Sequence, residues 1–573
     1  MISRGRLVVA IAAVGFALLV PAAASAHAYL IKTVPAASVV LNAAPASVQL
    51  TYDEAVEPRF AIISVTDKDA SSETTGPVSR SPSNPDTLLV PLRPHLPEGW
   101  YLVYWRAISV DGHPVQGAFT FAVGPNPGPA PQFVIPHVGQ SATTPSLVVA
   151  RWLVLLSAMS AIGLLAIRLA IARPAIRGVK GSSLRDVSVA FGIASTLSLV
   201  ATVVYVEEST AVDSLRSFWD VGNLVPLWRT TAFGRGYVDL LICLALFTVA
   251  GWIAIWVDRP ERERRSVAEI LAFIGAAAAA VAVVFIPGIS GHAAQTSPRG
   301  LAVTLDGLHV GSGSLWLGGL VGLLILWFGS PSAIRSSVLA LSVPRFSNVA
   351  LVSVLVLLGS GIWASVLHLP IWSALWTTSY GQVILAKASI LALAASVAAV
   401  NLLGTKPRLR TAGPDAGVVK LLRATVSLEV VLVVGAVFAA ALLSSLAPPS
   451  KFLGEEGGAI AKVGPGKVAR VVHRGPYTLS VLVDPNKAAA PNRFALQVTK
   501  GGKPVTGANV TVTFAMLDME MGNQEFQLTE TSPGVYSRTT PALVMVGHWG
   551  LDFGITPNGG QPFTALIVDR ANG

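Results

Sequence analysis

Three residues in the first part of the chain combine the donor types that Cu(II) prefers. If a leader peptide is cleaved after Ala26, His27 becomes the first residue and offers both an α-amine and an imidazole. Asp111 and His113 lie on either side of Gly112, and this spacing lets both side chains turn toward one point. Cu(II) favours nitrogen donors in a tetragonal arrangement. One amine, two imidazoles and one carboxylate therefore predict a four-donor Cu(II) site.

Three further histidines lie in or next to the long apolar stretches of the chain. His292 follows one apolar stretch, and His309 and His368 lie within the next two. With the membrane topology derived below, all three lie toward the outer face of the membrane. A structural hydrogen bond explains each histidine singly equally well, but a set on one face favours metal. The three residues therefore predict an acceptor site for copper.

Four charged side chains also fall inside apolar stretches, namely Arg151, Asp239, Lys387 and Glu429. Charges inside a membrane are costly and usually face the interior of a helix bundle. We expect these four residues to form structural pairs or to line a path through the bundle.

Sulfur donors gather near the end of the chain, where four of its 6 methionines lie. Thioether sulfur suits Cu(I). Methionine is also a flexible filler of hydrophobic cores, so the sequence leaves a Cu(I) site and core packing equally open. The candidate ligands here are Met516, Met519, Met521, Met545 and His548.

The composition places these residues in a membrane protein. Hydrophobic residues make up 52% of the 573 and charged residues 13%, against roughly 25% charged in soluble domains. The single cysteine, Cys243, excludes an internal disulfide and a CxxC thiolate site. Motifs of serine hydrolases, zinc proteases, P-loop NTPases and P-type ATPases are absent from the sequence. We therefore expect no enzyme and no ATP-driven pump.

The apolar residues form eight stretches near the roughly 20 residues that a bilayer requires. The eight lie at about 146–172, 187–206, 236–257, 267–289, 304–328, 348–368, 381–402 and 420–445. Alternate loops are rich in Arg and Lys, which predicts that those loops are cytoplasmic. The net charge of +10 is thus mainly a topology signal, and nucleic-acid binding is not supported. The sequence predicts a multi-pass protein of the cytoplasmic membrane whose two ends lie outside.

The remaining segments complete a five-part organisation. Residues 1–26 have the charged start, apolar centre and small-residue end of a signal peptide. Residues 27–124 and 465–573 alternate like β-strands and predict two outer β-sandwiches. A Pro-rich linker at 125–145 joins the first of them to a helical membrane domain at 146–449. The predicted fold class is therefore mixed, with about eight helical spans between two β-sandwiches.

Several of these segments resemble the CopC family of periplasmic copper-binding β-sandwiches. The similar segments are His27–Leu30, Leu50–Val56, Trp105–His113 and Gly117–Phe121. The resemblance implies that His27, Asp111 and His113 bind Cu(II) through the amine, the carboxylate and two imidazoles. Some members carry a Met-rich Cu(I) site as well. Because residues 27–124 contain no methionine, this domain resembles the kind that binds Cu(II) only.

The membrane domain resembles CopD, the polytopic partner that is fused to CopC in some bacteria. The similar segments are Gly291–Ala293, Asp306–Val310, Leu315–Leu320 and Ser379–Gln382, with Lys387, Arg423, Glu429 and Ala447–Pro449. The segment around Met516–Gly522 is similar to the YtkA-like domains that accompany copper proteins. These resemblances imply copper handling by all three folded parts.

Taken together, the sequence predicts a copper transporter that takes copper up on the outer face and moves it inward, in copper homeostasis or resistance. One alternative is a membrane b-type cytochrome, in which paired histidines ligate haem. Another is a sequestration or sensing protein that uses its spans as an anchor. The expected partners are copper ions, membrane lipid and other extracytoplasmic copper chaperones. The sequence leaves the oligomeric state open.

Overall fold

The computed structural model divides the chain into a helical unit and a β-rich unit. It describes residues 30–36, 39–52, 56, 58–108, 114–128, 131, 144–173, 177, 179–214, 218–219, 221, 224–230, 232–290, 293, 298–369, 372–411, 416–446, 461–488, 490–517, 524–544 and 547–572. The predicted signal peptide lies outside these residues. The helical unit and the two β-domains are each described by themselves below.

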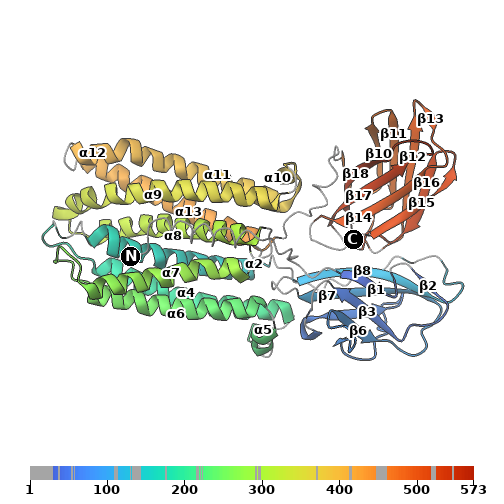
Figure 1. The fold of residues 1–573 in the computed structure, drawn as a ribbon, viewed down its shortest axis with the longest axis horizontal. Helices are drawn as coiled ribbons and strands as arrows, with labels where there is room; N and C mark the ends of the chain where they lie inside the picture. Colours follow the sequence, from blue (N-terminus) through green and yellow to red (C-terminus); the bar gives the residue numbers. More distant parts are fainter. Residues whose placement is uncertain are drawn as a thin grey trace, which may run out of the picture. The chain divides into compact units, whose positions relative to one another are not determined.

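The N-terminal domain is a β-sandwich, as the alternating sequence predicts (Figure 1). One sheet has the strand order β1 (Leu30–Val34), β3 (Ser47–Tyr52), β6 (Thr87–Pro91), β5 (Ser79–Arg80). The other has the order β2 (Val40–Leu41), β8 (Pro114–Val123), β7 (Gly99–Ile108), β4 (Ile62–Thr66). Along β3, buried residues alternate with partly exposed ones, because successive side chains of a strand point to opposite faces. The inward faces of the two sheets form the core.

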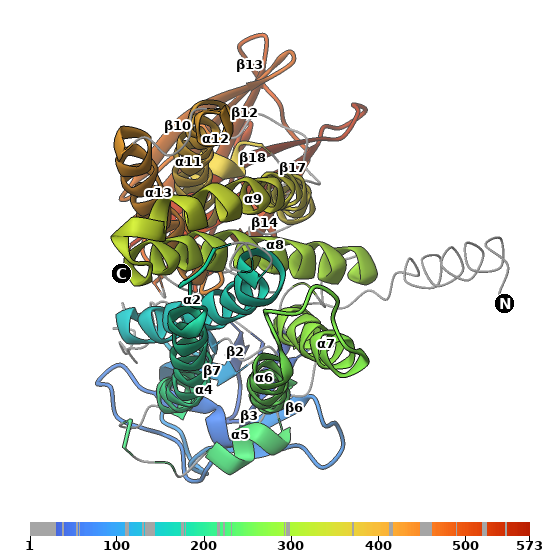
Figure 2. The same ribbon diagram turned by 90° about the vertical axis from the view of Figure 1, so that its left-hand side faces the viewer.

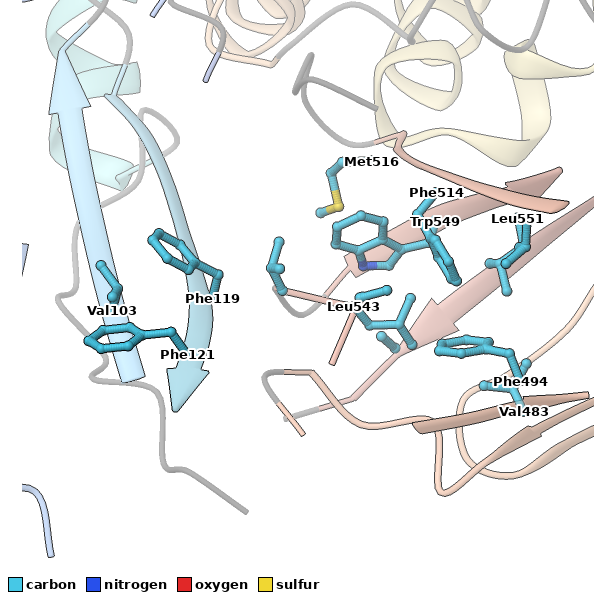
Figure 3. Packing of buried hydrophobic residues seen from close by; sticks show 14 of the residues in the cluster. Val103, Phe119, Phe121, Val483, Phe494, Phe514, Met516, Leu543, Trp549 and Leu551 are labelled. Carbon is cyan, nitrogen blue, oxygen red and sulfur yellow. The ribbon is translucent and has the colours of Figure 1, made fainter. Parts of the chain in front are cut away.

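The C-terminal domain is also β-rich, and its strands form one continuous ten-stranded sheet. Strand β15 joins the two halves of this sheet, because its first residues pair with β14 and its last with β16. The sheet encloses a core that includes Phe494, Phe514 and Leu551 (Figure 3). The strands are β9 (Ala461–Lys462), β10 (Val468–Arg474), β11 (Tyr477–Asp484), β12 (Asn492–Lys500), β13 (Lys503–Pro504), β14 (Asn509–Met516), β15 (Gln524–Ser532), β16 (Val535–Thr540), β17 (Gly547–Thr556) and β18 (Phe563–Ala571).

The part of the helical unit that the structure describes contains eight helices long and apolar enough to cross a membrane, which confirms the predicted number. The long helices are α2 (Pro145–Ala166), α4 (Arg185–Ser214), α6 (Ala232–Val257), α7 (Val267–Ser290), α8 (Arg299–Gly329), α9 (Ser332–His368), α11 (Ser379–Val400) and α13 (Ala416–Leu443). Two π-helical segments, η2 (Ile167–Ala172) and η4 (Asn401–Thr405), extend α2 and α11. Short helices are α5 (Leu224–Thr230), α10 (Ala374–Thr377) and α12 (Lys406–Thr411). Helix α9 begins well before the apolar stretch predicted from residue 348.

The long helices run side by side (Figure 1 and Figure 2), with α2 and α8 at the centre of the bundle. In their apolar windows, 72% of the α2 residues and 67% of the α8 residues are buried, against 6% in the span formed by α11 and its extension. Two glycines allow this close packing. A Cβ on Gly163 would lie 2.2 Å from the carbonyl oxygen of Ser314, and one on Gly318 would lie 2.5 Å from the Cα of Gly163. Small residues are typical of such helix crossings in membranes.

Contacts between helices define the two ends of the bundle. Gly163 meets Gly318 and Ile167 meets Gly322, so α2 and α8 run in the same direction. We call the end where α2 begins and α13 ends the linker end, and the opposite end the basic end. At the basic end, Asp258 accepts hydrogen bonds from both Arg168 and Arg173 at 2.6 Å. All three side chains are almost fully buried, which closes this end of the bundle with an ion-paired cluster.

Candidate functional site

A polar cluster on the linker side of the bundle centres on His309 of α8. Its Nδ1 lies 3.1 Å from the Ser360 hydroxyl of α9, and its Nε2 lies 3.3 Å from the Lys387 ammonium of α11. The Ser360 hydroxyl donates its own proton to the Val356 carbonyl at 2.6 Å. It must therefore accept from Nδ1–H of His309, which leaves the Nε2 lone pair to accept from Lys387. The lone pair that a metal would use faces an ammonium group.

Asp306 belongs to the same cluster. It lies one turn before His309 on α8, and its carboxyl attracts the Lys387 ammonium. Glycines on the neighbouring helices make room for both side chains. A Cβ on Gly288 of α7 would lie 2.8 Å from the Asp306 carboxylate, and one on Gly361 of α9 would lie 3.1 Å from the His309 ring. The missing side chains of Gly288 and Gly361 leave room for Asp306 between α7 and α8 and for His309 between α8 and α9.

His368 stands at a different depth. Its Nδ1 lies 2.7 Å from the Ala364 carbonyl of its own helix. Since α9 rises about 1.5 Å per residue, His368 lies about 12 Å along the helix from Ser360, the partner of His309. Two imidazoles on one metal ion have their nitrogens only about 4 Å apart. His309 and His368 therefore do not share a metal in this conformation. His292 lies outside the described residues, so the three-histidine acceptor site stays a prediction.

A second polar group lies deeper in the bundle. Glu429 of α13 accepts a hydrogen bond from the Asn401 amide of η4 at 2.5 Å. The Thr425 hydroxyl donates to Asn401 Oδ1 at 2.7 Å. Sequence reasoning named Glu429 but missed Asn401 and its neighbours. Trp316 of α8 was also missed. The 3–4–3 spacing of Asp306, His309, Gly313 and Trp316 places them on one face of α8 and could have indicated it.

The other intramembrane charges have varied partners. Arg151 donates to the Tyr205 hydroxyl at 2.6 Å and to the Ser445 hydroxyl at 2.8 Å. These bonds join α2 to α4 and to the end of α13. Lys387 faces His309 and Asp306, as described above. Lys387 contacts His309 and forms no ion pair within 4 Å among the described residues, so its structural pairing stays a prediction, and Arg151 binds neutral hydroxyl groups through these contacts.

The C-terminal candidate ligands divide into two groups. Met516 is 2% exposed and lies opposite Trp549 across β14 and β17. Figure 3 shows its side chain beside the indole ring within the domain core, which is the core-packing alternative for this residue. His548 lies opposite Arg570 on the neighbouring strand. Met519, Met521 and Met545 lie outside the described residues, and their Cu(I) role stays a prediction.

The N-terminal candidates lie outside the described residues, but their flanking strands are defined. Asp111 and His113 fall in the connection between the paired ends of β7 and β8, Ile108 and Pro114. Leu30, three residues after His27, pairs with Tyr52.

Tyr52 connects these two flanks. Its ring packs edge-on against Trp105 of β7 at 5.8 Å. The start of β1 and the end of β7 therefore meet at one end of the sandwich. The buried Tyr52 hydroxyl there has no hydrogen-bond partner among the described residues. The fold thus directs both flanks of the predicted Cu(II) ligands to the same place.

Within the described part of the chain, no three His, Cys, Asp or Glu side chains are grouped as a metal site. The geometry instead provides one histidine at the linker side, a carboxyl deeper inside, and a β-sandwich end whose loops carry the N-terminal candidates.

Family comparisons match the three folded parts in order. Residues 30–124 match the CopC domain, residues 340–443 match Copper resistance protein D, and residues 474–553 match the YtkA-like family. The chain belongs to the CopC–CopD fusion family of copper resistance and transport proteins. This CopC–CopD fusion also carries a C-terminal YtkA-like domain.

Individual relatives agree with this assignment. The fusion is 25% identical over 546 residues to "Copper transport protein CutJ" of Bacillus subtilis, covering 93% of this chain and 94% of that protein. It is 38% identical to "Protein YobA" of Escherichia coli over 17% of this chain and 79% of that protein. It is 35% identical to "Copper resistance protein C" of Escherichia coli over 19% of this chain and 90% of that protein.

Proposed function

We propose that this CopC–CopD fusion binds copper on the outer face of the cytoplasmic membrane and carries it inward through its helical bundle. The observation that supports this most is the polar face of central helix α8. Asp306 and His309 lie toward the linker end of this face, and Trp316 lies deeper, near Glu429. Polar groups at successive depths of a membrane bundle are the usual mark of an ion pathway.

The N-terminal domain would be the donor. We assign Cu(II) binding there to His27, Asp111 and His113, with the family resemblance and the meeting of β1 and β7 as support. The β-sandwich would pass copper to His309, which lies in the part of α8 nearest the linker end. For His309 to bind copper, the Lys387 ammonium must leave the Nε2 lone pair. Lys387 thus acts as a cation that copper replaces.

The inward orientation is supported by charge. The described loops at the basic end carry Arg177, Arg259, Arg262, Arg264 and Arg265, and basic loops stay in the cytoplasm. We therefore assign the linker end and both β-domains to the outer side. There the YtkA-like domain could meet extracytoplasmic copper chaperones. We propose a transporter without enzymatic activity.

The b-type cytochrome is not favoured by the geometry of the described histidines. Axial haem ligands must lie at matched depth on facing helices. His368 lies about 12 Å along α9 from Ser360, the residue that contacts His309, and both nitrogens of His309 are hydrogen-bonded.

Two measurements test the proposal. The first compares Cu(II) binding by a 27–124 fragment that begins with His27 and by a version extended with alanine. Because the extension removes the free amine at His27, we expect its affinity to fall by at least tenfold. Equal binding would remove His27 from the donor site.

The second measurement is copper uptake by proteoliposomes that contain the full chain. We expect His309→Ala to reduce uptake at least tenfold, because the acceptor lone pair is lost. His95→Ala, in an exposed loop of the N-terminal domain, is the matched control and should leave uptake unchanged. Normal uptake by the His309 variant would refute the acceptor role.

A further inference from the structure

Glu429 is a carboxyl group in the middle of a membrane span. It lies at the centre of the span Gly417–Leu443, and its side chain is 2% exposed. One oxygen, Oε1, accepts the hydrogen bond from Asn401. Among the described residues, no positively charged group is a partner of this carboxyl. An isolated carboxylate at this depth would be very costly.

The charged groups on the surrounding helices are directed elsewhere. Helix α13 packs against α2, α8 and η4. On α2 and its extension, Arg151 binds Tyr205 and Arg168 binds Asp258. On α8, Asp306 and His309 face Lys387 of α11. On α13 itself, Arg423 stacks over Phe328. The remaining charged residues of these helices are Arg299, the first residue of α8, and Lys420, the fifth residue of α13 and nine residues before Glu429. Glu429 is thus surrounded by neutral partners.

One of these neutral neighbours is a hydrogen-bond donor that lies within reach of the carboxyl but forms no hydrogen bond of full geometry with it. The indole of Trp316 on α8 lies beside the Glu429 carboxyl and is 1% exposed. Its Nε1–H has no hydrogen-bond partner in the described part of the chain. Buried donors are rarely left unpaired, and those that are call for an explanation. An ionised Glu429 would supply the missing acceptor, so the surroundings already contain a second donor for the carboxylate.

A polar route leads from Glu429 toward the basic end. Asn401 Oδ1 accepts from the Thr425 hydroxyl at 2.7 Å, and the Thr405 hydroxyl lies 3.4 Å from the same oxygen. Thr425 lies one turn closer to the basic end than Glu429 on α13. Thr405 lies one turn closer to the basic end than Asn401 on η4. Asn401 also begins the π-helical segment η4, and such segments are frequent at functional sites.

We propose that Glu429 is a proton-binding site of the transport path, protonated when the path is empty and deprotonated when a copper cation reaches it. This rests on the proposed function. In the step, the O–H bond breaks and the proton leaves toward the basic end past Asn401 and the two threonines. The carboxylate keeps the electron pair and becomes the counter-charge of the copper ion. Trp316 then donates its N–H to the carboxylate.

Carbodiimide labelling tests the protonation directly. Dicyclohexylcarbodiimide dissolves in lipid and adds to a protonated carboxyl but not to a carboxylate. On the full chain in lipid nanodiscs, we expect peptide mapping to find labelled Glu429 at pH 7 and a loss of that label with Cu(I) under ascorbate. Asp258, held between two arginines, should stay unlabelled, and Glu429→Gln should remove the label. Unlabelled Glu429 from pH 5 to pH 9 would overturn the proposal.

A second variant separates this role from a merely structural one. Trp316→Phe removes the indole N–H that would donate to the ionised Glu429 but keeps an aromatic ring. A hydrogen bond to a charged group is strong enough to move the pH midpoint of labelling upward by about one to two units. An unchanged midpoint would contradict the assigned role of Trp316 in the ionised state.

Transport is measured separately, so that the two proposals can fail independently. If proteoliposomes with the unaltered chain take up no copper, the proposed function fails, and copper-sensitive labelling alone then upholds the site at Glu429. If uptake occurs, we expect it to depend on the pH at the basic end and Glu429→Gln to abolish that dependence. Uptake by this variant with the same rate and pH dependence would overturn the proton site and leave the transport proposal intact.

Discussion

The contact between His309 and Lys387 leads to a prediction that runs against the usual effect of removing a polar residue. Lys387→Leu deletes the ammonium that lies 3.3 Å from His309 Nε2. Because that ammonium occupies the lone pair that copper needs, its loss frees the ligand. We expect copper binding by the helical bundle to become tighter in the variant.

The magnitude follows from the interaction that copper no longer has to displace. A hydrogen bond that involves a charged group contributes about 1.5–3 kcal/mol, which corresponds to roughly 10- to 150-fold in affinity. The loss of repulsion between ammonium and copper acts in the same direction. Asp306 loses its partner too and becomes an additional counter-charge for copper. The double variant Asp306→Asn with Lys387→Leu removes that contribution and isolates the freed lone pair.

The assay is a competition between the full chain and a copper chelator of known affinity. His113→Ala in every sample silences the predicted donor domain, so that the bundle dominates the signal. Lys406→Leu is the matched control, because Lys406 donates to Asn348 at 2.8 Å in a helix at the basic end, away from His309. Unchanged or weaker binding by Lys387→Leu would refute the idea that Lys387 competes with copper.

Two predictions concern stability. Gly163→Ala should destabilise the bundle by about 1–3 kcal/mol in unfolding by sodium dodecyl sulfate, because the new Cβ would lie 2.2 Å from the Ser314 oxygen. Gly359→Ala is the control, because a Cβ at Gly359 would have no atom within 4 Å. Equal losses of stability in the two variants would contradict the packing argument. In the C-terminal domain, burial raises the pKa of Asp569 to about 6, against the hydrogen bond from Asn486. Stability should therefore be full below about pH 4 and fall by about 3 kcal/mol as pH rises through 6. Asp569→Asn should abolish this dependence in thermal unfolding of residues 461–572, and a persistent pH slope would exclude Asp569 as its cause.

Much of the site could be named from the sequence because its residue types are rare in their surroundings. A histidine, a lysine or a glutamate inside an apolar stretch is conspicuous, and His309, Lys387 and Glu429 were singled out in this way. Ser360, Asn401 and Trp316 could not be found by the same reasoning. Neutral side chains such as these do not stand out in an apolar stretch as a charge does, and their roles depend on which helix faces them.

The methionines show the same limit. The abundance of sulfur near the chain end indicated Cu(I) or core packing with equal weight. The pairing of β14 with β17 places Met516 opposite Trp549 in the core, and this depends on strand register. A shift by one residue would turn Met516 to the other face of the sheet.

The sequence by itself determined the domain order, the eight spans and the chemistry of the candidate ligands. These follow from composition and periodicity, which act locally along the chain. Only the tertiary structure decided that His309 meets Lys387, that His309 and His368 stand at different depths, and that Glu429 lies among neutral partners. Such neighbours come from different helices, and their contacts depend on helix packing, here set by the close approach of Gly163 and Gly318.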